Sequence, residues 1–482
     1  MTMQLNPRTY TLAATALGSS LAFIDGTAVI VALPTIQKAL HLGLNGEQWV
    51  FLAYSLALAA LYLVGGALGD RLGHRQMFSR GIVGFALASA LAGLATSGLS
   101  LIVARVLQGT AGAFVTTNSL AWLRSVYGDQ AGKAVGLWTS LTGISTIIAP
   151  PLGGALTQWL SWRWIFYINL PLAALVLYWA RRGVADQPGE DSKRPLDLVG
   201  SGLIATSFGF LTYFLVQGAK NGFRSLWWAL GIGLVSLAGF IIAEGRLKHP
   251  LLPFRLFRNR NFLVANLETL LIYGALNGIF VYFTLYLQFL GLAPLASSLF
   301  LIPTSLVLIA LAAYFGARAD RLGPRWLLTA GPLLIGAGAL LFSFIPSKDA
   351  IWLRGGIGVA IFSLGLAMLV APITALALKS VEAKVAGLAS GINNTVSRLG
   401  GLIVVAVVGM SISLVFFNRV PDKKEVPLGL YQSSQLTRQA SVRGYQYGMW
   451  LVSGLAFAAA ATGWFGIVSL GKETANSRNF KV

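Results

Sequence analysis

The sequence predicts an all-α integral membrane protein built from two bundles of six helices with two further helices inserted between them. Of its 482 residues, 56% are hydrophobic and only 11% are charged, whereas a soluble domain usually carries about 25% charged residues. Long apolar runs alternate with short basic segments along the chain. So few charges cannot cover a water-soluble protein of this size, which leaves a multi-pass membrane protein.

The charge balance indicates a membrane partner rather than nucleic acid. Lysine and arginine number 36 against 16 aspartates and glutamates, which gives a formal net charge of +20. The basic residues lie in the hydrophilic breaks, as expected of cytoplasmic loops that face anionic lipid headgroups. We therefore expect membrane lipids as partners and no binding of nucleic acid.

Nothing in the sequence points to catalytic, metal or cofactor chemistry. Cysteine is absent, which excludes disulfides and thiolate metal sites. The three histidines, His41, His74 and His249, are far apart in hydrophilic segments. The phosphate-binding pattern GxxxxGK[ST] does not occur, and no long soluble segment could house an enzyme. We expect neither an enzyme nor a metal or cofactor site, and no direct drive by ATP.

Fourteen apolar segments are long enough to cross a bilayer, which requires about 20 helical residues. They are 10–32, 49–69, 78–97, 101–122, 134–157, 165–181, 196–216, 226–244, 262–287, 295–316, 326–345, 351–377, 387–415 and 446–470. Most lysines and arginines fall in the even-numbered connections and the two ends, which the positive-inside rule assigns to the cytoplasm. We expect a plasma-membrane protein, in a bacterium one of the inner membrane, whose first span is an uncleaved signal-anchor.

Two charged segments divide the spans into groups of six, two and six. RRGVADQPGEDSKRP (181–195) follows the sixth span, and GRLKHPLLPFRLFRNRNF (245–262) precedes the last six. The predicted organisation is an N-terminal six-helix bundle over 1–182, a linker with two extra spans over 183–261, a C-terminal six-helix bundle over 262–470 and a cytoplasmic tail over 471–482.

An internal repeat supports this division. The connection after the second span reads GALGDRLGHR (66–75), and the connection after the tenth reads GARADRLGPR (316–325). Five residues recur at the same spacing: Gly66, Asp70, Arg71, Gly73 and Arg75 correspond to Gly316, Asp320, Arg321, Gly323 and Arg325. A generic charged turn is a poor explanation for this match in equivalent connections, so a duplication is indicated. Two related six-helix halves are typical of alternating-access transporters.

Several motifs together resemble the major facilitator superfamily and, within it, the fourteen-span drug:proton antiporter family. They are FIDGTAVIVALPTIQ (23–37), the GALGDRLGHR loop, LIVARVLQGTAGA (101–113), APPLGGAL (149–156), WRWIFYINLP (162–171) and HPLLPFRLFRNRNF (249–262). Ser145 and Ala149 stand where the fifth-helix motif has glycines, a departure that weakens the inference of antiport. The resemblance implies the major facilitator fold and export of lipophilic small molecules, cations among them, in exchange for protons. We expect a monomer.

Asp25 and Glu268 are the carboxylates that we place inside spans, in the first and the ninth, and we expect none in the inserted pair. A charge in mid-bilayer costs a few kcal/mol or more, so such residues usually face a cavity or a partner. Removal from water disfavours the charged form, so such a carboxyl can take up a proton near neutral pH. Proton coupling is therefore one role for both. A helix-packing hydrogen bond is the alternative for Asp25, and snorkelling to the interface for Glu268.

Arg105 lies about one turn inside the fourth predicted span. Its charge requires a counter-charge or several carbonyl groups at that depth. In the resembling family such an arginine is tied to proton transfer, so the predicted proton-coupling set is Asp25, Glu268 and Arg105. A structural bridge to a neighbouring helix is the alternative for this arginine.

Two further groups of residues are expected to move. The repeated loop forms a latch in which its aspartate pairs with an arginine or a helix N-terminus of the other half, although charges that only set topology would give the same pattern. This predicted gate comprises Gly66, Asp70, Arg71, Gly73, Arg75, Asp320, Arg321 and Arg325.

Small residues and prolines make the fifth span a hinge, or a case of ordinary close packing. The hinge residues are Gly136, Pro150, Pro151, Gly153 and Gly154.

Aromatic and amide residues inside spans are candidates for a substrate cavity, because aromatic faces attract flat lipophilic cations. These candidates are Trp49, Tyr54, Asn118, Trp138, Tyr273, Asn277, Tyr282 and Asn394. An interface belt is the alternative for several of them, above all for Trp49.

The sequence thus predicts a proton-coupled secondary transporter that exports lipophilic small molecules by alternating access. Another cargo, such as a lipid, an organic anion or a metabolite, suits the same fold, because embedded acids are few and Arg105 is embedded. A membrane scaffold or a lipid-modifying enzyme is the third alternative, and it leaves the repeated loop without a purpose.

Overall fold

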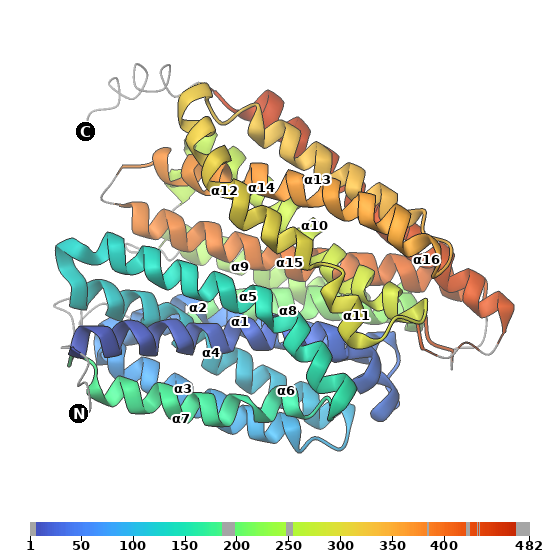
Figure 1. The fold of residues 1–482 in the computed structure, drawn as a ribbon, viewed down its shortest axis with the longest axis horizontal. Coiled ribbons are helices and arrows are strands. Elements are labelled where there is room, and N and C mark those ends of the chain that lie inside the picture. The colour runs from blue at the N-terminus through green and yellow to red at the C-terminus, as the bar shows by residue number, and fades with distance from the viewer. Residues whose placement is uncertain are drawn as a thin grey trace. The chain divides into compact units, whose positions relative to one another are not determined.

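The computed structural model of the chain is helical, with no strand among the residues it describes (Figure 1). The described residues are 6–185, 198–246, 254–382, 385–420, 425–430, 432 and 434–468. The predicted tail 471–482, the segment 186–197 and His249 lie outside them.

The chain forms two compact units, unit 1 from Met1–Ala243 with Leu292–Leu299 and unit 2 from Glu244–Gly291 with Phe300–Val482. Unit 1 contains α1 (Pro7–Ala39), α2 (Leu44–Leu72), α3 (His74–Gly93), α4 (Gly98–Tyr127), α5 (Ala131–Trp159), α6 (Trp164–Tyr167), α7 (Asn169–Arg182), α8 (Leu198–Asn221), most of α9 (Trp227–Arg246), and α11 (Pro294–Leu299). Unit 2 contains α10 (Arg260–Phe289), α12 (Ile302–Leu322), α13 (Leu327–Ser343), the π-helical turn η4 (Ile351–Gly355), α14 (Gly356–Lys379), α15 (Ala386–Phe417) and α16 (Gln435–Gly466).

The helices confirm the prediction of an all-α multi-pass membrane protein. Within the described ranges, eleven helices are long and apolar enough to cross a membrane, or twelve if the bent pair Leu44–Tyr62 and Val64–Leu72 is one span. The helix α3 is not among them, and α13 is shorter, with 17 residues. The count of fourteen spans therefore stays a prediction.

Two of the predicted spans are interrupted. The range 165–181 contains α6 and α7, which are separated at Ile168, and the range 295–316 contains α11 and α12. Pro303 lies in the first turn of α12. Proline suits this position, because the first residues of a helix have no intrahelical partner for their N–H groups.

The repeated glycines end equivalent helices with the same backbone conformation. Gly73 terminates α2 with φ of 93°, and Gly323 terminates α12 with φ of 83°. Residues with a β-carbon rarely adopt this region, so each turn requires glycine. The repeat that the sequence indicates thus has a structural counterpart in each unit.

Within unit 1, the inserted helices contact α2 through α8. Asn45 of α2 donates to Oε1 of Gln217 at 2.9 Å, and the rings of Trp49 and Tyr213 lie 6.4 Å apart. On the far side, Tyr213 also contacts Trp228 of α9, at 6.0 Å between ring centres. The structure thus makes α8 a neighbour of α2.

Two further buried acids contradict the expectation that Asp25 and Glu268 are the only carboxylates inside spans. Glu47, in the first turn of α2, is 3% exposed, and Glu244, near the end of α9, is 1% exposed. The prediction missed Glu47 because the helix begins at Leu44 rather than at residue 49. It missed Glu244 because this residue stands at the boundary of an apolar run.

Candidate functional site

Two predicted charges of unit 1 meet in its interior. Nη1 of Arg105, two turns into α4, donates to Oδ2 of Asp25, near the middle of α1. The two side chains form a salt bridge in which neither is exposed. Sequence analysis named both residues but did not pair them.

Three uncharged side chains complete the hydrogen bonds of the ion pair. Gln108 accepts from Nη1 of Arg105 at 2.9 Å and donates to Oδ1 of Asp25 at 3.1 Å. Asn169, the first residue of α7, donates to the same Oδ1 at 3.2 Å. Both amides also donate to Oγ of Ser89 on α3, at 2.8 and 3.2 Å. These five residues, which we call the polar cluster, join α1, α3, α4 and α7.

The helix α2 contributes a carbonyl and a ring to the guanidinium of Arg105. Nε donates to the carbonyl of Val50 at 3.0 Å, and the ring centre of Tyr54 lies 4.3 Å from the guanidinium carbon. The hydroxyl of Tyr54 donates to the carbonyl of Ala22 at 2.8 Å, which fixes its ring. A desolvated cation–π contact contributes about 2 kcal/mol. Nη2 of Arg105 has no hydrogen-bond partner among the described residues.

Several hydrogen bonds of the polar cluster involve the carboxylate of Asp25. Removing two charges from water costs several kcal/mol per ion, and only close pairing with satisfied hydrogen bonds offsets that cost. A proton on Asp25 would remove the counter-charge of Arg105 and turn one acceptor of the cluster into a donor. Uptake of that proton would therefore change bonds that join four helices, which is the property a coupling site needs.

Glu268 of α10 has a different environment. Its side chain is 0% exposed, and neither carboxyl oxygen has a hydrogen-bond partner among the described residues. It therefore does not snorkel to a surface in this structure. An ionised carboxylate is costly to bury without donors or a cation, so this environment suits the neutral acid.

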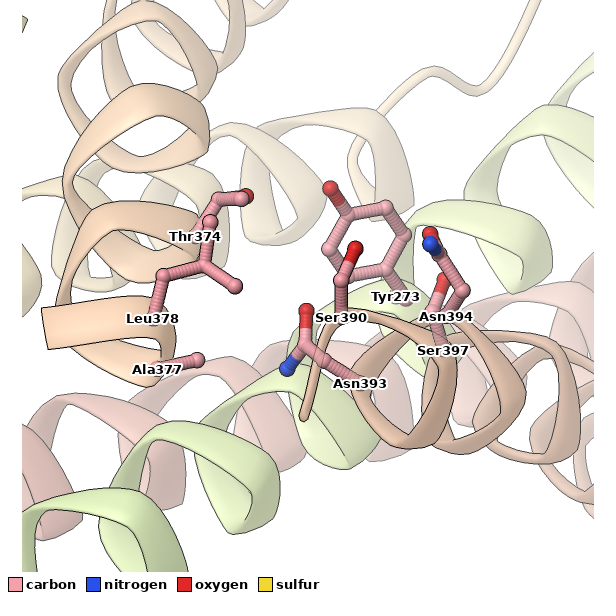
Figure 2. Close-up of a pocket in the computed structure, with 8 residues that line it drawn as sticks. All are labelled: Tyr273, Thr374, Ala377, Leu378, Ser390, Asn393, Asn394 and Ser397. Carbon is pink, nitrogen blue, oxygen red and sulfur yellow. The ribbon is translucent and has the colours of Figure 1, made fainter. Parts of the chain in front are cut away.

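A small polar cavity of about 50 Å³ lies between α10, α14 and α15 in unit 2. Its lining residues are Tyr273, Thr374, Ala377, Leu378, Ser390, Asn393, Asn394 and Ser397. Figure 2 shows Thr374, Ala377 and Leu378 on one wall, with Ser390 and Asn393 across from them. A cavity needs about 10–15 Å³ to hold one water, so this one suits a few waters.

Asn393 connects this cavity with the helical turn that carries Glu268. Its Nδ2 donates to Oγ1 of Thr269 at 2.9 Å and to Oδ1 of Asn266 at 3.3 Å. Both partners are buried, and each also donates to a carbonyl of its own helix. A chain of polar groups thus runs from the cavity to the residues on either side of Glu268.

The first copy of the repeated loop is built around His74. Its Nε2 lies 3.3 Å from Oδ1 of Asp70, and its Nδ1 lies 3.0 Å from Oδ1 of Asn118 on α4. Asn118 is fully buried and donates to the carbonyl of Gly65 at 2.8 Å. A β-carbon at Gly69 would overlap this amide. Asn118, predicted in a substrate cavity, thus joins α2 to α4 in this conformation.

The repeated arginines hold the last turn of the sixth helix in each half. Arg75 donates through Nε to the carbonyl of Ala180 at 2.9 Å and through Nη2 to that of Arg181 at 2.8 Å, at the end of α7. Arg325 donates to the carbonyl of Trp464 at 2.7 Å, near the end of α16. Cations favour the C-terminal end of a helix because its last carbonyls are unpaired. These contacts lie within each unit.

The other predicted gate residues make fewer contacts. Arg71 and Arg321 are exposed, and a β-carbon at Gly66 would meet no atom within 4 Å. The side chain of Asp320 lies outside what the structure describes. A latch between the two halves therefore stays a prediction.

The predicted hinge residues of α5 fall into two groups. Pro150 and Pro151 lie inside the helix. A β-carbon at Gly153 would stand 2.6 Å from the carbonyl oxygen of Ala28 on α1, and one at Gly154 would stand 2.8 Å from the α-carbon of Leu295 on α11. A β-carbon at Gly136 would meet nothing within 4 Å. Close packing thus requires two of the three glycines.

Of the eight predicted cavity residues, only Tyr273 and Asn394 line the cavity of Figure 2. The other six have partners elsewhere: Trp49 against Tyr213, Tyr54 on Arg105, Asn118 at His74, Trp138 bonded to Ser119, Asn277 to the carbonyl of Tyr273, and Tyr282 to the carbonyl of Val405. Their contact with a cargo stays a prediction.

Sequence analysis missed three members of the polar cluster. Gln108 could have been found, because it follows Arg105 by three residues and so shares its helix face. Asn169 lies within the WRWIFYINLP motif, which the analysis quoted without assigning a role to the amide. Ser89 carried no signal, because a single serine in an apolar helix is common.

A protein-family model matches most of this chain. The model described as Major Facilitator Superfamily matches residues 15–405, a range that includes the polar cluster, both copies of the loop and the cavity. The chain belongs to the Major Facilitator Superfamily. The resemblance drawn from the motifs is thereby confirmed.

Curated relatives within this superfamily carry names that refer to drug resistance. Multidrug resistance protein Stp of Mycobacterium tuberculosis is 33% identical over 407 residues, 83% of this chain and 75% of the relative. The tetracenomycin C resistance and export protein of Streptomyces glaucescens is 32% identical over 86% of this chain and 77% of its own length. Puromycin resistance protein pur8 of Streptomyces alboniger is 32% identical over 80% and 78%, respectively.

Solved structures of the superfamily share the fold. A bacterial homologue of the human lysosomal transporter Spinster aligns with a TM-score of 0.69 and 16% identity over 99% of this chain and 98% of that one. The peptide transporter PepTSo aligns with a TM-score of 0.66 and 14% identity, covering 99% of each. The chain is therefore a major facilitator transporter rather than an enzyme.

Proposed function

We propose that the chain is a proton-coupled secondary transporter that exports lipophilic small molecules, cations among them, by alternating access. The buried pair of Asp25 and Arg105 carries this proposal, because a proton or a cationic cargo can compete for the carboxylate. The relatives support the class of cargo, since their names refer to multiple drugs, tetracenomycin C and puromycin.

The proposal includes fourteen spans, with α6–α7 counted as one, α11–α12 as one, and η4 joined to α14. The surplus of basic residues in the even-numbered connections supports cytoplasmic ends and, in a bacterium, a place in the inner membrane. The bundles 1–182 and 262–470, the linker 183–261 and the tail 471–482 belong to this proposal, as does a monomeric transporter.

Asp25 would act as the switch of unit 1. While it is ionised, it holds Arg105 and accepts from Gln108 and Asn169, so α1 is tied to α4 and α7. Once Asp25 is protonated, the guanidinium of Arg105 keeps its contacts with the carbonyl of Val50, the amide oxygen of Gln108 and the ring of Tyr54. Helix α1 would then be free to shift relative to α4.

Glu268 would be the second coupling acid, in unit 2. Asn393 links the cavity to Thr269 and Asn266, which lie in the same helical turn as Glu268. The cavity itself is too small for cargo, because pockets for drug-sized ligands measure about 300–1,000 Å³, against about 50 Å³ here. Tyr273 and Asn394 would contact the cargo in a conformation in which this space is wider.

The gate and the hinge complete the proposal. The loop residues Asp70, Arg71 and Arg75, with Arg321 and Arg325, would change partners when the transporter changes state. Helix α5 would pivot at its two prolines while Gly153 keeps it against α1.

Transport by purified protein in liposomes tests the proposal, with the pH of each side and the voltage set independently. We expect uptake of a lipophilic cation to follow an imposed proton gradient, and Asp25→Asn to abolish this dependence. Asp349→Asn, which removes an exposed carboxylate, is the matched control. Exchange of labelled for unlabelled substrate without a gradient shows that each variant is folded. Gradient-dependent transport by Asp25→Asn at the normal rate contradicts the assignment of Asp25 as a coupling residue. A substrate screen on the same vesicles separates drugs from lipids, organic anions and metabolites as the cargo.

A further inference from the structure

Glu47 is a buried acid that the proposed mechanism does not use. It lies in the first turn of α2 and is 3% exposed. Oε2 accepts a hydrogen bond from Nε2 of Gln37, near the end of α1, at 3.3 Å. Oε1 is buried and has no hydrogen-bond partner among the described residues. One amide donor is a weak compensation for a carboxylate in this position.

No cation in the described part of the chain compensates this carboxyl. The charged or titratable residues on neighbouring elements at this end of unit 1 are Lys38 in the last turn of α1, His41 after that helix, Arg105 on α4, and Tyr213 and Lys220 on α8. None of the first four forms an ion pair or a hydrogen bond with Glu47, and the side chain of Lys220 lies outside the described residues. The charged residues of α3 lie in its first two turns, at the opposite end.

The helix α2 places Glu47 on the side that faces Arg105. Residues 47, 50 and 54 share one helix face, since they are three and seven positions apart. Val50 contributes the carbonyl that accepts from Nε of Arg105, and Tyr54 contributes the ring under its guanidinium. Glu47 therefore lies three residues, about 4.5 Å along the axis, before the residue whose carbonyl holds Arg105. It lies on the side where α1 connects to α2.

The flank of α2 that contacts α8 is a different one. Asn45 and Trp49, four residues apart, meet Gln217 and Tyr213. The burial of Glu47 thus comes from the interior of unit 1 rather than from the interface with the inserted helix. A substitution at Asn45 can therefore serve as the control for a substitution at Glu47.

We propose that Glu47 is a second proton-exchange site of unit 1, placed between the Asp25–Arg105 pair and the end of the unit where α1 joins α2. This inference rests on the proposed proton-coupled transport. In the described conformation Asp25 is the carboxylate and Glu47 the neutral acid. When Asp25 takes up a proton, that proton comes from Glu47, and Glu47 takes one from the water at the α1–α2 end when Asp25 later releases its own.

The proposal has a clear chemical balance. One O–H bond forms at Asp25 and one breaks at Glu47, so the number of carboxylates in this part of unit 1 stays at one. Unit 1 thus keeps one carboxylate to balance the buried guanidinium of Arg105 throughout. An uncompensated buried charge would be costly. The topology proposed above puts the α1–α2 end on the external side, so the proton that restores Glu47 comes from the external water, as export coupled to proton entry requires.

Glu47→Gln tests this site, because glutamine keeps the shape and the polarity of the side chain but cannot release a proton. We expect transport by the variant to lose its dependence on external pH and to keep its dependence on internal pH. Asn45→Ala, on the α8 flank, is the matched control, and we expect it to keep both dependences. Unchanged dependence on external pH in Glu47→Gln overturns the proposal. If Glu47→Gln and Asn45→Ala both lose the same fraction of their transport rate at every pH, Glu47 has a structural role, and the proposal is likewise overturned.

An infrared difference spectrum gives a readout that does not depend on transport. Wild type minus Glu47→Gln should show the C=O band of a buried carboxylic acid, shifted by deuterium exchange, and a carboxylate band in its place contradicts the proposal. If the wild type shows no gradient-dependent transport, the proposed function fails. If the wild type is gradient-dependent and Glu47→Gln is unchanged, only the assignment of Glu47 fails.

Discussion

The guanidinium of Arg105 and the carboxylate of Asp25 form an ion pair inside unit 1, with both side chains fully buried. The two residues are 80 positions apart, so the pair joins α1 to α4 rather than neighbouring turns of one helix. This relationship changes what a substitution at either residue will do, because each charge depends on the other for its stability.

Neutralising Asp25 alone should therefore destabilise the protein. Breaking a buried pair from one side typically costs about 3–5 kcal/mol, because the remaining charge is buried without compensation. We expect Asp25→Asn to lower the thermal unfolding temperature of the detergent-purified protein. The double variant Asp25→Asn, Arg105→Gln should recover part of the loss, since no uncompensated charge remains.

The control for this cycle is Ser89→Ala, which removes a neutral acceptor of the same polar cluster. We expect it to cost about 1–3 kcal/mol, the usual effect of leaving buried donors unpaired. Additive effects of the two charge substitutions would show that the ion pair contributes no coupling energy to the folded protein.

How far the sequence predicts this site depends on the kind of residue. Asp25 and Arg105 were predictable because a charge in an apolar run demands a partner, yet their pairing was not, because it depends on how α1 packs on α4. Glu47 was missed because the apolar run begins after the helix does. The turn at Gly73 and Gly323 was predictable from the repeat, whereas the break at Ile168 leaves no trace in hydropathy.

The close contact of α5 with α1 gives a second prediction, at Gly153. An added β-carbon would stand 2.6 Å from the carbonyl oxygen and 2.9 Å from the α-carbon of Ala28, and backbone atoms cannot rotate away. We expect Gly153→Ala to push α5 from α1 and to cost about 1–3 kcal/mol, together with a slower rate of substrate exchange.

Gly136 of the same helix is the matched control, because its β-carbon would enter open space. Gly136→Ala should leave the unfolding temperature unchanged or raise it slightly, as alanine favours the helix by about 1 kcal/mol. Equal effects of the two substitutions would exclude close packing as the reason for glycine at position 153.

The repeated arginines provide a third prediction, a difference between equivalent positions. Arg75 donates two hydrogen bonds to the end of α7, one of them part-buried, whereas Arg325 donates one exposed bond to α16. We expect Arg75→Gln to lower the unfolding temperature more than Arg325→Gln, because bonds from a charged donor contribute about 1.5–3 kcal/mol and exposure reduces this. A larger effect at Arg325 would show that these contacts do not determine the stability of the two helix ends.

The contact of the inserted helix α8 with α2 can be tested by cross-linking, because the chain has no cysteine to interfere. The amide of Asn45 donates to the amide oxygen of Gln217 at 2.9 Å, so these side chains lie close together. We expect the pair Asn45→Cys, Gln217→Cys to react with a short bifunctional thiol reagent in membranes. The pair Asn45→Cys, Trp227→Cys is the control, since Trp227 is 72% exposed on α9. Efficient cross-linking of the control pair and none between positions 45 and 217 would mean that α8 does not contact α2 at this point.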